Sequence, residues 1–198
     1  MRTANVSTKW HYTTRMTHHL GSILASGILL REGETPGYYA GVKPFVKALW
    51  FSTNPVFEQT ALKIFSGKDS SERRVECHLA LGARIAVAGD MAPISWYQFK
   101  LMELGSPRLA RNKRRERREG LERMESAGRS YGATPDEWWC SLDRVPSSQW
   151  LSLEIYVAGR WIAVDPDKSE EYIYTGGYVE DDVEKLVKRF GTPVSVAA

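Results

Sequence analysis

Cysteine is scarce in this 198-residue chain, which contains Cys77 and Cys140 and no others. Neither lies at the C-x-x-C or C-x-x-H spacing of a zinc ligand set, and two cysteines are too few for the disulfide framework of a small secreted domain. We therefore expect free thiols in a reducing cytoplasm. His18 and His19 are adjacent, so on a helix their side chains point about 100° apart, and we expect no metal site.

Long apolar runs are also missing. No segment approaches the roughly 18 consecutive apolar residues that a membrane span requires, and the first six residues, MRTANV, lack the apolar stretch of a signal peptide. We therefore expect a cytoplasmic protein that does not act in a membrane. Hydrophobic residues make up 42% of the chain and charged residues 26%, which is typical of a globular protein. The length predicts a single domain over residues 1–198.

Two motifs that would have settled the function are absent. The sequence contains no G-x-x-x-x-G-K-[ST] phosphate-binding loop, and no G-x-G-x-x-G follows a predicted strand. The chain is therefore not expected to be a P-loop nucleotidase or a Rossmann-type dehydrogenase. Aromatic residues are plentiful instead, with seven tryptophans and nine tyrosines. They would serve either the core or a site that stacks flat rings.

The hydrophobic pattern predicts strands interspersed with helices. Alternation of apolar and polar residues is strict over residues 151–157, and residues 160–164 return as its hairpin partner. Further strands are expected at residues 9–13, at 48–53 and within 75–87; helices are expected at 17–27, 95–104, 107–130 and 179–190. Because β-α-β units do not alternate regularly, we expect an α+β fold with a mixed, split sheet and flanking helices.

Four short segments combine polar residues with an apolar frame. They read WHYTT at residues 10–14, HL-x-x-IL-x-x-GIL at 19–29, LWFSTNP at 49–55 and WLSLEI at 150–155. Together they resemble the ADP-ribosyltransferase superfamily, in particular small prokaryotic and phage members, including the DarT-type nucleic-acid ADP-ribosyltransferase toxins. The shared features are a first strand with His-x-Thr, a helix ending in Gly-Ile/Leu-Leu, an aromatic strand before a proline turn, and a late strand with one glutamate. The resemblance covers residues 9–65 and 145–165.

The resemblance implies that NAD is the substrate and that it is bound in a bent form. His11 would hydrogen-bond a ribose hydroxyl, while backbone groups at Tyr12 hold the nicotinamide carboxamide, with Thr13 on the same strand. Ser52 or Thr53 would support the site from the second strand. The aromatic rings available to sandwich the nicotinamide are those of Tyr12, Tyr38, Tyr39, Trp50 and Phe51.

Glu154 is the carboxylate that the resemblance makes catalytic, together with His11. Cleavage of the nicotinamide–ribose bond builds positive charge at ribose C1′, which a nearby carboxylate stabilises. The same group can hydrogen-bond the 2′-hydroxyl or accept a proton from the acceptor. This interpretation requires His11 and Glu154 to converge on one cleft. Taken singly, each is more often an ordinary hydrogen-bonded or solvated side chain.

Two departures from the family pattern are present. DarT-type proteins carry an arginine near the second motif, whereas residues 52–55 here read STNP. The candidate replacements for that arginine are Arg15, Arg31, Lys43 and Lys47. Position 152 is a serine, so the late motif reads Ser-Leu-Glu rather than the Glu-x-Glu or Gln-x-Glu of many protein-modifying relatives.

Positive charge is concentrated between Arg108 and Arg129, where nine Lys/Arg and four Glu give a local balance of +5, against +3 for the whole chain. We treat this segment, residues 106–130, as a basic helical insertion. Arg111, Arg114, Arg115 and Arg118 are its candidate acceptor-binding residues, since arginines recognise phosphates and acidic proteins. The alternative is a solvated helix whose glutamates pair with arginines three or four residues away.

The predicted function is an NAD-dependent mono-ADP-ribosyltransferase acting on a macromolecular acceptor, nucleic acid or protein. Two alternatives stay open. One is an NAD-dependent RNA 2′-phosphotransferase, whose relatives use several arginines and a histidine on the phosphate. The other is a non-catalytic module that binds nucleic acid or protein through the basic helix. The sequence identifies neither the acceptor nor the oligomeric state.

Overall fold

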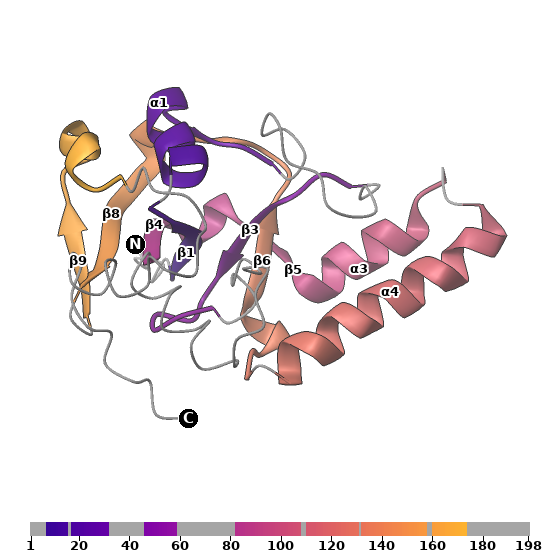
Figure 1. Cartoon of the computed structure of the whole chain (residues 1–198). Coiled ribbons are helices and arrows are strands. Elements are labelled where there is room, and N and C mark those ends of the chain that lie inside the picture. Colours follow the sequence, from indigo (N-terminus) through magenta and orange to yellow (C-terminus); the bar gives the residue numbers. More distant parts are fainter. Residues whose placement is uncertain are drawn as a thin grey trace, which may run out of the picture. The chain divides into compact units, whose positions relative to one another are not determined.

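The computed structural model describes residues 7–15, 17–31, 46–58, 82–107, 110–130, 132–157 and 160–173 (Figure 1). Tyr38, Tyr39 and the helix expected at 179–190 lie outside these ranges, as does the first part of the strand region at 75–87.

The α+β fold class is confirmed. A seven-stranded sheet has the order β5-β6-β3-β1-β4-β8-β9, and two short strands, β2 and β7, form a second sheet. Every strand pair whose register is defined in the described ranges is antiparallel. The strands are β1 (Thr8–Thr14), β2 (Ile28–Leu29), β3 (Leu49–Ser52), β4 (Gly82–Ala88), β5 (Ile94–Ser95), β6 (Trp138–Ser141), β7 (Val145–Pro146), β8 (Trp150–Val157) and β9 (Arg160–Val164). The helices are α1 (Ser22–Ser26), α3 (Trp96–Gly105) and α4 (Arg111–Ser130).

The chain divides into two compact units. The first contains residues 1–10, 28–60 and 87–149, and the second contains residues 11–27, 61–86 and 150–198. Strands β1 and β4 each contribute residues to both units. Helices α3 and α4 belong to the first unit, whereas α1, β8 and β9 belong to the second.

An aromatic cluster forms the core of the first unit. The Trp96 ring lies 5.7 Å from Trp50, 5.9 Å from Phe99 and 5.2 Å from Trp138, measured between ring centroids. Trp50 pairs with Cys140 across β3 and β6, so the sheet places the partly buried Trp50 next to the buried Cys140 in this cluster. Ser95 begins α3 with a reciprocal capping box with Gln98. The helix predicted after Ser95 is therefore confirmed.

Helix α4 is polar but firmly attached to α3. Leu121 is buried in the aromatic cluster. The fully buried Glu103 of α3 accepts a hydrogen bond from Arg117 Nε at 2.7 Å. Helices this polar are usually solvent-facing or loosely attached. The buried ion pair and Leu121 give it an anchor that periodicity alone does not reveal.

The second unit holds the predicted N-terminal helix and the C-terminal hairpin. The helix opens with a π-helical turn, Thr17–Gly21, and continues as α1. Gly27 ends it at φ 63°, a left-handed conformation that favours glycine, as expected. In the hairpin, Glu154 pairs with Ala163 and Tyr156 with Trp161. Leu153 and Ile155 are buried as the alternation predicts, whereas Leu151 is 61% exposed and Tyr156 is buried.

Two kinds of feature are absent from the residues that the structure describes. No helix there has both the length and the apolar content that crossing a membrane would take. No group of three or more His, Cys, Asp or Glu side chains there is arranged to hold a metal ion.

Candidate active site around Glu154

Side chains from four strands of the second unit meet on one face of its sheet. Residues two apart on a strand share a face, so Ser152, Glu154 and Tyr156 of β8 point the same way. Trp161 of β9 is the cross-strand partner of Tyr156 and therefore lies on this face too. Arg84 of β4 and Tyr12 of β1 complete the set from the other side of β8 in the strand order.

Both oxygens of the Glu154 carboxylate are engaged. Oε2 accepts a hydrogen bond from Arg84 Nε at 2.7 Å and lies 2.5 Å from Arg84 Nη2. Oε1 accepts a hydrogen bond from Ser152 Oγ at 2.7 Å. Each carboxylate oxygen has more than one acceptor site, so the group can still accept from a bound ligand. The Glu154 side chain retains 17% exposure and Arg84 9%, so the carboxylate is fixed yet reachable.

Aromatic rings surround this ion pair. The Trp161 ring lies 5.7 Å from the Tyr12 ring and 5.1 Å from the Tyr156 ring, both edge to face. The guanidinium carbon of Arg84 lies 4.4 Å from the centroid of Trp161, within cation–π range. Arg84 Nη1 also donates to the Tyr12 hydroxyl at 3.4 Å. Burial raises the pKa of Tyr156, so its hydroxyl stays protonated at neutral pH.

His11 precedes Tyr12 on β1 and belongs to the same unit as Glu154. Tyr12 is buried and contacts Arg84 and Trp161. Regular alternation along a strand would turn His11 and Thr13 to the face opposite Tyr12. Burial along β1 is not regular, however, because the adjacent Trp10 and His11 are both half-buried. The expected convergence of His11 and Glu154 thus receives no support from the pattern of β1. Of the predicted cofactor-binding residues on β1, Tyr12 is the one whose contacts with Arg84 and Trp161 the structure defines.

The candidate residues of the second strand belong to the first unit and have partners there. Trp50 packs in the aromatic cluster, and Phe51 is buried. Ser52 Oγ donates to Glu58 Oε2 at 2.8 Å, and the Thr53 amide donates to the Glu137 carbonyl at 3.0 Å. These contacts explain in structural terms why aromatic and polar residues occupy positions 50–53.

Glu58 is a buried carboxylate that the sequence did not single out. It is 6% exposed and accepts hydrogen bonds from Ser52 and from Trp138 Nε1, the latter at 3.1 Å. Both donors lie on strands that pair with each other, Ser52 opposite Trp138. The carboxylate thus cross-links β3, β6 and the segment after β3.

Arg84 is the arginine that sequence reasoning missed. Of the four basic residues considered as substitutes, Arg15 is buried and donates to the Tyr156 carbonyl at 3.4 Å. Arg31 donates to the Leu142 carbonyl at 3.0 Å in the other unit. Lys47 is exposed, and Lys43 lies outside the described residues. A single charged residue within the apolar run GARIAVA was the available signal, since a buried charge requires a partner.

The four candidate acceptor-binding arginines, at positions 111, 114, 115 and 118, are all exposed on α4. They belong to the first unit, whereas Glu154 belongs to the second.

Ser130 occupies the centre of a G-x-S-x-G sequence at residues 128–132. That spacing occurs in hydrolases where a strand turns sharply into a helix and exposes the serine. Here Ser130 is instead the last residue of α4, and its hydroxyl donates to the Ala127 carbonyl at 2.7 Å. The motif therefore does not form a nucleophile elbow.

Comparisons with protein-family models, with curated proteins and with solved structures return no match for this chain.

Proposed function

We propose that this protein is an NAD-dependent mono-ADP-ribosyltransferase. It would cleave the nicotinamide–ribose bond of NAD and transfer ADP-ribose to a macromolecular acceptor, nucleic acid or protein. The observation that carries the proposal is the Glu154 carboxylate, which is held on one oxygen by Ser152 and on the other by Arg84 beside the rings of Tyr12 and Trp161.

A fixed carboxylate of this kind would favour cleavage of the nicotinamide–ribose bond. As the nicotinamide leaves, positive charge develops on the ribose ring, and a fixed negative charge stabilises it. Glu154 would also accept a hydrogen bond from the ribose 2′-hydroxyl. A preorganised group is worth more than a mobile one because no reorganisation is needed when the charge appears. Ser152 and Arg84 supply that preorganisation as positioning residues.

The aromatic side chains suit a substrate with a flat ring. The Tyr12 and Trp161 rings lie beside the Arg84–Glu154 pair, and Trp161 is partly exposed. Such rings stack on heteroaromatic groups. Trp161 therefore joins Tyr12 as a candidate nicotinamide-binding residue. The ribose-binding role of His11 and its convergence with Glu154 stay predictions, and the proposal rests on both.

The transfer step is tested with NAD labelled on its adenylate phosphate. The protein is incubated with the labelled NAD and cell lysate, and the macromolecular fraction is then treated with protease or nuclease. The proposal predicts label in the macromolecular fraction that one of the two digestions releases. Absence of label in that fraction, at millimolar NAD and across lysate concentrations, would contradict it.

A further inference from the structure

Helix α4 carries its charge unevenly. Residues 111–118 contain six Lys/Arg and one Glu, a balance of +5, whereas residues 119–130 contain two Arg and three Glu, a balance of −1. Four exposed arginines in the first half, at positions 111, 114, 115 and 118, follow the spacing i, i+3, i+4, i+7. That spacing places them in one row along one face of the helix.

This row is electrostatically costly to the isolated protein. Arginines three and four residues apart repel each other, by about 0.2–0.5 kcal/mol per pair. The positive end of the helix dipole adds to the cost, since the first turn contains no acidic residue. Lys113 and Arg117 have nearby glutamates, at 3.0 Å and 2.7 Å. Within the part of the chain that the structure describes, Arg111, Arg114 and Arg118 have no ion-pair partner, and Arg115 has only Glu119 at 3.6 Å.

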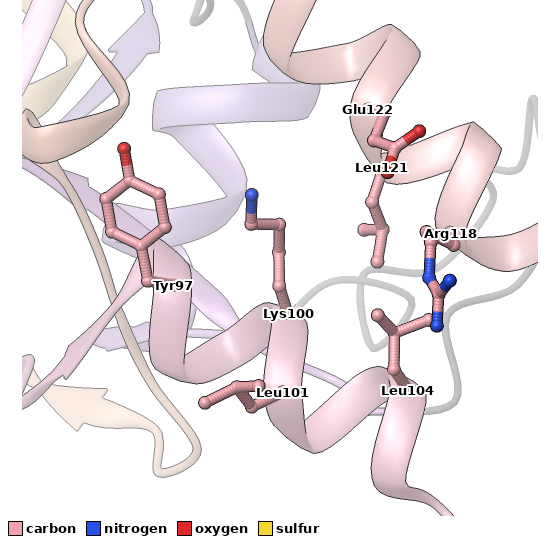
Figure 2. Close-up of a pocket in the computed structure, with 7 residues that line it drawn as sticks. All are labelled: Tyr97, Lys100, Leu101, Leu104, Arg118, Leu121 and Glu122. Atoms are coloured by element: carbon pink, nitrogen blue, oxygen red, sulfur yellow. The ribbon is translucent and has the colours of Figure 1, made fainter.

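A groove of about 300 Å³ between α3 and α4 lies beside this row, and Arg118 belongs to both (Figure 2). Its α3 wall also has i, i+3, i+4, i+7 spacing and is formed by Tyr97, Lys100, Leu101 and Leu104. Its α4 wall is formed by Arg118, Leu121 and Glu122. Because Arg114 and Arg111 precede Arg118 by one and two helical turns, the row continues the rim of the groove along α4.

Exposed apolar side chains gather on the same two helices. Among the described residues, six large hydrophobic side chains are exposed, and four of them lie on α3 or α4. Leu101, in the groove, is 72% exposed and Tyr97 41%. Lys100 is already neutralised by Glu125, whose carboxylate lies 2.6 Å from its ammonium. The groove therefore presents apolar surface, and its α4 side carries the arginine row together with the exposed carboxylate of Glu122.

We infer that the α3–α4 surface docks an acidic amphipathic helix of a partner protein. Apolar side chains of that helix would enter the groove over Leu101, Leu104 and Tyr97, and its carboxylates would pair with the arginine row. Amphipathic helices bind hydrophobic grooves in this way, and arginine pairs well with carboxylates because its guanidinium is planar and forked. A nucleic-acid backbone would satisfy the arginines but would leave Leu101 in water. The inference is independent of the proposed transferase activity.

The test uses a fluorescein-labelled 18-residue peptide with leucines at i, i+3, i+4 and i+7 and glutamates on its other face. Fluorescence anisotropy gives its Kd for the full chain, without NAD. Comparison probes are a scrambled peptide of the same composition, the same peptide with lysine for glutamate, and a single-stranded 20-mer each of DNA and RNA. We expect the amphipathic acidic peptide to bind at least tenfold more tightly than the scrambled and lysine peptides.

Variants of the protein distinguish specific binding in the groove from general attraction by positive charge. Leu101→Ser and the double substitution R114E/R118E should each weaken binding of the acidic peptide about tenfold or more. Arg123→Ala is the matched control, because Arg123 lies about 140° around α4 from Arg118 and should leave the Kd unchanged. Equal binding of the scrambled peptide, or no effect of Leu101→Ser, would overturn the inference. Arginine-dependent binding of an oligonucleotide without binding of the peptide would also overturn it, in favour of nucleic acid.

Discussion

Arg84 and Glu154, 70 residues apart in sequence, form an ion pair in which Arg84 Nε lies 2.7 Å from Glu154 Oε2. Both side chains are largely buried, at 9% and 17% exposure. A pair this desolvated is costly to form and more costly to break, because removal of one partner leaves the other charge uncompensated. The pair therefore fixes the position of the carboxylate to which we assign the chemistry.

Replacement of Arg84 tests this coupling. Arg84→Met should lower the free energy of unfolding by about 3 kcal/mol, at the low end of the range for a broken buried pair. The double variant Arg84→Met/Glu154→Gln should recover part of that loss, since no unpaired charge remains. Urea denaturation of the wild type, of Arg84→Met, of Glu154→Gln and of the double variant completes a double-mutant cycle. Additive effects would show that the two residues do not stabilise each other.

Ser152 is expected to act through Glu154 rather than on the substrate. Loss of a hydrogen bond to a charged group costs about 1.5 kcal/mol, so Ser152→Ala should lower kcat for nicotinamide release about tenfold with little change in KM. The matched control is Ser148→Ala, because Ser148 is exposed in the turn that precedes β8. A change in KM with constant kcat would instead indicate that Ser152 binds the ground state of the substrate.

Glu125 predicts a pH dependence of stability. Hydrogen bonds from Lys100 and then from Trp96 lower the pKa of Glu125 from 4.5 to about 2. An acid whose pKa is lowered on folding stabilises the protein above its unfolded pKa, and that contribution is lost as the pH falls toward the folded pKa. The loss of stability caused by Glu125→Gln should therefore be largest above about pH 5 and should shrink between about pH 4.5 and 2.

Urea denaturation at a series of pH values measures this difference. Glu116→Gln is the control, because the Glu116 side chain is 66% exposed and pairs only with Lys113 among the described residues. Its effect should be small at every pH. A Glu125→Gln effect that does not vary with pH would contradict the assignment.

Cys140 should be inert while the protein is folded. Its side chain has no exposure, and burial raises the pKa of the thiol to about 12. The thiolate is the reactive form, so iodoacetamide at pH 8 should leave Cys140 unmodified in the native protein and alkylate it in urea. Mass spectrometry of the peptide that contains Cys140 measures its alkylation separately from that of Cys77. Rapid native alkylation at Cys140 would show that β6 opens on the timescale of the reaction.

Local patterns were the part of the fold that the sequence predicted well. Gly27 marks the end of its helix because a left-handed residue is needed there, and Ser95 begins α3 through contacts within four residues. The hairpin of β8 and β9 follows from alternation within fifteen residues. In each case the determining interactions are close in sequence, so a short window contains them.

Long-range partners were the part that could not be predicted. Strand β6 was not expected, because what holds it in place is pairing with β3, about 90 residues earlier. Arg84 is recognisable as a site residue only once its partner Glu154 is known. The faces of β1 are a similar case: the sequence gives the alternation of His11 and Tyr12, but not which of them faces β8. For that reason the candidate site kept Glu154 and Tyr12 and gained Arg84 and Trp161.

The most direct test of the account is release of nicotinamide from NAD by the purified protein, with and without lysate, beside Glu154→Gln. Glu119→Gln, an exposed carboxylate on α4, serves as the control, and urea denaturation verifies that each variant is folded. Loss of one preorganised electrostatic group costs about 2.7–4 kcal/mol, or 100- to 1,000-fold in kcat. We expect release that lysate stimulates, that Glu119→Gln preserves and that Glu154→Gln lowers by about this factor. No release at millimolar NAD, or equal release by folded Glu154→Gln, would contradict the assignment of Glu154 as the catalytic carboxylate.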